Sequence, residues 1–170
     1  NYELKLKILG VSVKIGEINS NLTFDDTNYS LNFKLNSDKL VNIITSIDGV
    51  GEVSGIMVNS ILYPKDYQYT SIKKEKKKNT KVLFNSSTVI FSETDPRFDK
   101  NMLSPISDEM LIGTIDPVTA IIYMSDYNLN NKCTINYKIY DGKRRYDLSY
   151  TNIEYESEYI ICKMKQKKIG

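Results

Sequence analysis

The sequence predicts a mainly β protein that forms a single domain over residues 1–170. Its antiparallel sheet is built from about nine short strands, and two short helices accompany it. Apolar and polar residues alternate with a period of two in several separate runs, as in strands with one buried and one solvated face. Turn sequences separate these runs at short intervals. The 170 residues, of which 41% are hydrophobic, supply one core and too little length for two domains.

The alternation is clearest in the first three strands. Residues 2–8 carry apolar side chains at every second position, and Gly10 then resets the phase for a second strand that begins at residues 11–15. The polar turn at residues 19–21 ends that strand, and the same alternation recurs over residues 29–35. The sequence therefore predicts three antiparallel strands at this end of the chain.

Two segments have the apolar spacing of short helices. Residues 37–38 offer an N-cap for the first helix, over residues 40–47. In the second, Asp116 caps the helix and Pro117 occupies its first turn, ahead of residues 118–124. Each helix is expected to have two or three turns at about 3.6 residues per turn.

The remaining segments return to extended patterns. Residues 52–62 are extended, with Gly51 and Gly55 as candidate bulge positions. Two further hairpins follow, and residues 93–105 then form the longest irregular connection. The chain ends in three strands, over residues 134–140, 144–151 and 157–167, and the first two are joined by the type I′ turn signal Asp141-Gly142.

Composition excludes several kinds of chemistry. The chain has no His, which removes Ser-His and Cys-His hydrolase triads and the commonest zinc ligand. A net charge of +2 is too small for a strongly basic nucleic-acid binder, so we expect no nucleic-acid partner. No cofactor or metal motif occurs, and we expect neither. No apolar stretch reaches the roughly 18–20 residues of a membrane span, so the chain is not expected to be transmembrane.

Cys133 and Cys162 are the only cysteines, and each lies in a strand-like run. We predict a disulfide between them, worth about 3–4 kcal/mol by loop entropy, and an oxidising compartment. Two buried thiols in a cytosolic protein are the alternative. The start at Asn1, without Met, is expected of a mature chain after removal of a signal peptide, or of a trimmed one.

Arg144 and Arg145 stand side by side in a chain where Lys outnumbers Arg by 20 to 3. That bias indicates an AT-rich genome, so an Arg in place of Lys implies a geometry that Lys cannot supply, such as a bidentate fork to a carboxylate. On a strand the two point to opposite faces. We expect one to be buried in an ion pair with Asp116 or Asp147. Anchoring of an anionic head group, near the turn at Asp141, is the alternative.

A lysine-rich segment lies between two alternating runs. We interpret it as a solvated hairpin tip whose charges prevent edge pairing. Docking on an anionic membrane surface is the alternative. The lysines of this segment are Lys73, Lys74, Lys76, Lys77 and Lys78.

Three blocks of sequence occur in order over nearly the whole chain. They are Gly10 with residues 14–18, the Asp-Pro block at residues 113–120, and the stretch from Cys133 through Asp141-Gly142-Lys143-Arg144-Arg145 to Cys162 and residues 168–170. With these blocks the chain resembles a family of bacterial envelope proteins known as domain of unknown function 3108, chiefly its alphaproteobacterial branch. The resemblance implies a secreted, periplasmic protein without established enzymatic activity. It also implies a strongly curved antiparallel sheet, a half-barrel or β-spiral similar to that of lipoprotein carriers.

We therefore expect a periplasmic, non-enzymatic protein that binds a lipid or another hydrophobic envelope component, or that maintains envelope integrity. The curved sheet would enclose an apolar groove with helices at its mouth. Alternating residues of several strands are candidates for the groove lining, namely Leu4, Leu6, Val13, Phe33, Phe84 and Ile135.

A structural or interaction protein of the envelope, with a core filled by its own side chains, is the alternative function. Partners would then dock on the lysine-rich hairpin. An enzyme that uses only carboxylates, for example on glycans, is a third hypothesis, because two Asp or Glu at a suitable separation suffice for glycoside hydrolysis.

Overall fold

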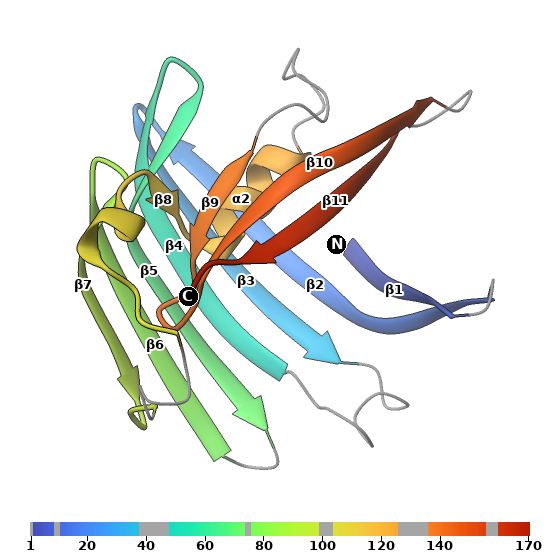
Figure 1. Ribbon diagram of the computed structural model, residues 1–170, viewed down its shortest axis with the longest axis horizontal. Coiled ribbons are helices and arrows are strands. Elements are labelled where there is room, and N and C mark those ends of the chain that lie inside the picture. Colours follow the sequence, from blue (N-terminus) through green and yellow to red (C-terminus); the bar gives the residue numbers. More distant parts are fainter. Residues whose placement is uncertain are drawn as a thin grey trace.

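A computed structural model gives the fold of the chain (Figure 1). It describes residues 2–8, 11–37, 48–73, 76–98, 104–125, 136–155 and 160–170. These ranges contain eleven strands, one α-helix and one 3₁₀ helix. The prediction of a mainly β, antiparallel protein is thereby confirmed. The first predicted helix, over residues 40–47, lies outside the described residues.

The larger sheet has seven strands in the order β1-β2-β3-β4-β5-β6-β7. Each strand pairs antiparallel with the next one along the chain, so the sheet is a continuous meander (Figure 1). Its strands are β1 (Tyr2–Ile8), β2 (Val11–Asp25), β3 (Asn28–Ser37), β4 (Asp48–Val58), β5 (Ile61–Lys73), β6 (Lys76–Asn85) and β7 (Thr88–Asp95).

The smaller sheet has four strands in the order β11-β10-β9-β8. Only the pair of β8 with β9 is parallel within this sheet. The Thr114 N–H donates to the Ser87 carbonyl at 2.9 Å, and this bond joins the β8 edge to the turn before β7. The remaining elements are the 3₁₀ helix η2 (Asp108–Leu111) and the strands β8 (Thr114–Ile115), β9 (Tyr137–Tyr140), β10 (Arg145–Tyr155) and β11 (Ile160–Lys168).

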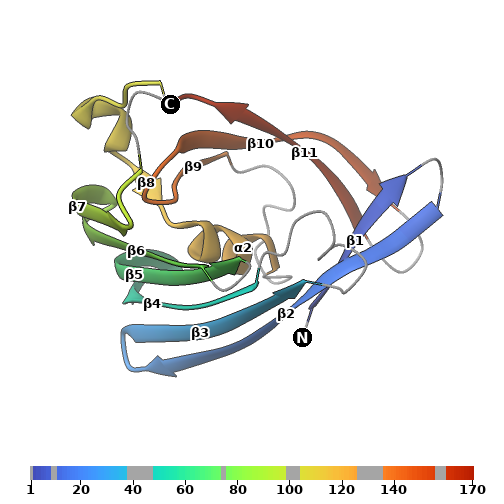
Figure 2. The same ribbon diagram turned by 90° about the horizontal axis from the view of Figure 1, so that it is seen from below.

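Helix α2 (Pro117–Ser125) lies between the two sheets (Figure 2). Val118 belongs to the core cluster on the seven-stranded sheet, and Ala120 to the cluster on the four-stranded sheet. Tyr123 contacts both sheets, because its hydroxyl donates to the Leu62 carbonyl at 3.0 Å while its ring stacks on Tyr137 with centroids 5.7 Å apart. The helix therefore packs against both hydrophobic clusters, to which strand β9 also contributes through Tyr140 in one and Ile139 in the other.

Two predicted strand boundaries were wrong. Strand β2 does not end at residues 19–21, because its pairing with β3 continues to Asp25 and Asn28. The hydrogen bonds and side-chain contacts of this pairing outweigh the weak turn propensity of Asn and Ser. The run 52–62 is not one strand either. A two-residue turn at Asn59 and Ser60, with φ of 50° and 63°, separates β4 from β5, and positive φ at both residues is what a type I′ hairpin requires.

The hairpin at Asp141 was predicted correctly, but its turn type was not. Strands β9 and β10 pair from Tyr140 and Arg145, so the connection has the four residues 141–144 rather than two. Gly142 has φ of 85°, and Asp141 has no positive φ. The Asp141 carboxylate instead accepts the backbone N–H groups of Lys143 and Arg144 at 2.9 Å and 2.6 Å, and these bonds fix the open loop.

Candidate binding cavity

A cavity of about 420 Å³ lies between the seven-stranded sheet, α2 and the loop from β9 to β10. This volume falls in the range of small-molecule sites, about 300–1,000 Å³. Side chains of β2, β3, β5 and β6 form its floor in rows that follow the strand register. The row at one end is Ile18, Leu35, Ser71 and Lys78, and the middle row is Ser20, Phe33, Tyr69 and Thr80.

Strand β4 contributes glycines rather than side chains to these two rows. Gly51 lies between Phe33 and Tyr69 in the register, and the two rings stack across it with centroids 5.8 Å apart. A Cβ atom at Gly51 would lie 2.5 Å from the Phe33 ring, and one at Gly49 would lie 2.4 Å from the Tyr69 hydroxyl. The floor is therefore aromatic because β4 carries no side chain at these positions.

The opposite wall is helix α2, which Asp116 holds in place. The Asp116 side chain is fully buried and accepts the N–H groups of Val118 and Thr119 at 2.8 Å and 2.9 Å. The Thr119 hydroxyl donates to the same carboxylate at 2.6 Å and lies 3.2 Å from the Tyr29 hydroxyl on β3. Burial raises the pKa of Asp116 despite these bonds. The predicted capping by Asp116 is confirmed, and Val118, Ile121 and Ile122 then face the cavity.

The cavity is charged at the end nearest β6. Lys78 and Lys143 both line it, and each ammonium lies over the Phe98 ring, at 5.7 Å and 5.6 Å from the centroid. Burial lowers the pKa of Lys78, and the neighbouring Lys143 lowers it further. Tyr146 lines the same end, and its burial raises the pKa of the phenol to about 12, with a contribution from Asp141. The opposite end, at β2 and β3, carries no charged side chain and is apolar except for Ser20.

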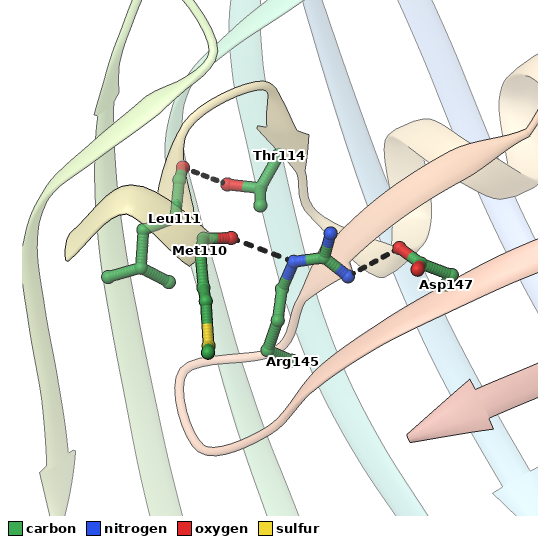
Figure 3. A network of polar contacts seen from close by, with 5 residues as sticks. All are labelled: Met110, Leu111, Thr114, Arg145 and Asp147. Carbon is green, nitrogen blue, oxygen red and sulfur yellow. Dashed lines mark hydrogen bonds and ion pairs between the residues drawn. The ribbon is translucent and has the colours of Figure 1, made fainter. Parts of the chain in front are cut away.

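The buried arginine is Arg145, which is 4% exposed. Its Nε donates to the Met110 carbonyl at 2.9 Å and its Nη1 to the Asp147 carboxylate at 2.7 Å (Figure 3). Arg144 is exposed. The prediction that one arginine is buried and paired is confirmed, but the predicted bidentate fork to a carboxylate was wrong, because only Nη1 reaches Asp147 and Nε goes to a backbone carbonyl. The pairing with Asp116 was wrong, because the buried cap of α2 uses both oxygens of that carboxylate on the helix itself.

Of the predicted groove residues, Phe33 lines the cavity. Phe84 shares the inward face of β6 with Lys78, but it is 4% exposed and packs in the core beyond the cavity. The side chains of Leu4, Leu6 and Val13, and the whole of Ile135, lie outside the described residues.

The lysine-rich hairpin forms the tip of β5 and β6. Lys73, Lys76 and Lys77 are exposed as predicted, and Lys74 lies outside the described residues. Lys78 is different, because it is half-buried and lines the cavity. Sequence reasoning missed this role for Lys78 and missed Lys143 altogether. The signal was the period of two that puts Lys78 on the same face as Val82 and Phe84.

Cys133 lies outside the described residues, and of Cys162 the structure gives only the backbone position, opposite Ile153. The disulfide therefore stays a prediction. Within the described ranges, no three His, Cys, Asp or Glu side chains lie close enough together to hold a metal ion. Nor does any helix in those ranges have the length and apolar character needed to cross a membrane.

Comparison with known proteins gives one match. No curated protein and no solved structure is significantly similar to the chain. One family model matches residues 1–166. The chain therefore belongs to the family described as "Protein of unknown function (DUF3108)".

Proposed function

We propose that this protein is a non-enzymatic binding protein of the periplasm, and that it holds the acyl chain of a lipid or another hydrophobic envelope component. The observation that carries the proposal is the cavity of about 420 Å³ with aromatic and aliphatic walls. Without a ligand this open space holds water, so its aromatic and aliphatic walls stay in contact with solvent. An acyl chain displaces that water, and removal of the chain itself from water is favourable by about 0.8 kcal/mol per methylene.

The proposed shape follows from the same cavity. In this proposal the seven-stranded sheet curves into a half-barrel, similar to that of lipoprotein carriers, and α2 closes its mouth. The stacking of Phe33 on Tyr69 across Gly51 supports the idea, because side chains of β3 and β5, on either side of β4, come into contact on the face toward α2. Maintenance of the envelope would then depend on uptake or transfer of the bound component.

Lipid occupancy tests the function. Native mass spectrometry of gently purified protein should show a co-purified ligand, and extraction should release an acyl lipid. Ser20→Phe fills the middle row of the cavity and should abolish this occupancy. Asn21→Phe is the matched control, because Asn21 is exposed on the opposite face of β2. Asn21→Phe should keep the ligand.

A negative result would favour another class of function. If the wild-type protein carries no lipid, and the delipidated protein binds no apolar fluorescent probe, the cavity is not a ligand site. The protein is then better explained as a structural or interaction protein of the envelope.

The compartment has its own test. Mass measurement of the unreduced protein after alkylation should show neither Cys133 nor Cys162 modified, because we propose that the two form a disulfide. Modification of both would remove the main physical support for a periplasmic location.

A further inference from the structure

The cavity is charged at one end only. In the register of the sheet, Ser71 is opposite Lys78 on β5 and β6, while the same row continues to the apolar Leu35 on β3. The row ends at Ile18 on β2, so it spans five strands, and the four spacings between them correspond to about 19 Å at about 4.8 Å each. The site therefore has the polarity and the length of an extended single-chain amphiphile.

The two ammonium groups at the charged end form no ion pair with the residues that the structure describes. Among the described residues, neither Lys78 nor Lys143 has a carboxylate within ion-pair distance. The nearest acidic residue on the cavity wall, Asp141, uses its Oδ1 to accept the N–H groups of Lys143 and Arg144. The end thus carries a surplus of positive charge, to which Arg144 adds from the exposed side of the loop.

Both ammonium groups contact the ring of Phe98, and burial together with the nearby Lys143 lowers the pKa of the Lys78 ammonium. Both lie on the Phe98 ring at nearly equal distances, 5.7 Å and 5.6 Å from the centroid. The face of an aromatic ring attracts cations and so offsets part of the repulsion between them. An anionic oxygen placed between the two lysines would replace that repulsion by two charge-assisted hydrogen bonds.

We infer that the cavity binds a single-chain amphiphile with an anionic head, a carboxylate or a phosphate, whose head lies between Lys78 and Lys143 and whose chain runs across the strands toward Leu35 and Phe33. This inference rests on the proposed function, because it specifies the ligand class of the same cavity. Lys78 and Lys143 are the residues that recognise the head.

The test compares ligands that differ only in the head. Binding of laurate, lauryl phosphate and lauryl alcohol to delipidated protein is measured by calorimetry. The anionic ligands should bind about tenfold more tightly than the alcohol. Lys78→Gln with Lys143→Gln should remove this preference. The matched control is Lys76→Gln with Lys77→Gln, which removes the same charge from exposed positions of the same hairpin and should keep the preference.

The outcomes separate the inference from the function on which it rests. Equal binding of laurate and lauryl alcohol to the wild-type protein would overturn the inference and leave the function intact. An equal loss of preference in both double variants would also overturn it, because general surface charge would then be the cause. Failure of all three ligands to bind would refute the proposed function itself. A preference confined to laurate or to lauryl phosphate supports the inference and identifies the head as carboxylate or phosphate.

Discussion

Replacement of Arg145 by Lys tests the role of the guanidinium most directly. Arg145 connects β10 to η2 through the Met110 carbonyl and reaches the Asp147 carboxylate with a second nitrogen (Figure 3). Its backbone also pairs with Ile169 and Gly170, at 2.8 Å and 3.0 Å. Lys keeps the charge and the backbone bonds. It has a single nitrogen, however, and cannot hold two acceptors in the fixed fork geometry of Arg.

The expected loss of stability follows from the hydrogen bond that Lys cannot make in place of Arg145. The loss of a hydrogen bond from a buried charged group costs about 1–3 kcal/mol. The Asp147 side chain is 37% exposed, so water can replace its partner and the ion pair itself contributes at most about 1 kcal/mol. We therefore expect Arg145→Lys to lower the free energy of unfolding by about 1–2 kcal/mol. For a chain of this length that corresponds to about 2–8 °C in Tm.

Urea unfolding followed by circular dichroism measures this loss. With an m value of about 2 kcal/mol/M, the midpoint should fall by about 0.5–1 M while m stays unchanged. Arg144→Lys is the matched control, because Arg144 is adjacent and exposed, and it should change stability by less than about 0.5 kcal/mol. If the two variants unfold at the same urea concentration, the guanidinium geometry has no structural role and our reasoning fails.

Three further predictions concern the cavity and its walls. Gly51→Val should separate the Phe33 and Tyr69 rings, destabilise the protein by about 1–3 kcal/mol and reduce occupancy by lipid, as measured by melting and native mass spectrometry. Ser54→Val, at an exposed position of the same strand, should do neither. Asp116→Ala removes the cap of α2 and should cost at least about 0.5–2 kcal/mol in urea unfolding; a variant as stable as the parent would contradict the capping role. Burial raises the pKa of Tyr146 from 10.0 to about 12. Between about pH 10 and pH 12 the folded state therefore keeps the phenol proton that the unfolded state releases. The free energy of unfolding should therefore fall as the pH rises from about 10 to about 12, and phenolate absorbance should develop later in native than in urea-unfolded protein.

Much of the fold could be predicted because it depends on local patterns. The period of two located the strands, and Asp116 before Pro117 located α2, since a cap and a first-turn proline are read from neighbouring residues. The turns were harder to predict. Asn59 and Ser60 join two apolar runs without a glycine, and the turn propensity of Asn and Ser alone does not tell this turn from residues 19–21, where the strand continues.

The candidate site was predicted less well, because it depends on long-range packing. The burial of one arginine follows from its residue type, but its partner depends on which groups the fold brings near it. The spacing of Arg145 and Asp147 by two residues places both on one face of a strand, and this favours Asp147 over the distant Asp116. Lys78 was hidden in a run of lysines; the period of two distinguishes it from Lys77, but its contact with Phe98 and its place on the cavity wall depend on the fold.

The meander of the seven-stranded sheet also sets an order of folding. Every strand pairs with the strand that follows it, so each ladder forms between segments close in sequence. Helix α2 is different, because its contacts from Thr119 to Tyr29 and from Tyr123 to Leu62 span 90 and 61 residues. The entropy of closing such long loops favours formation of the sheet first and docking of the helix last. The cavity comes into existence only at that final step. A ligand that occupies it should therefore slow unfolding of the finished protein without accelerating its folding.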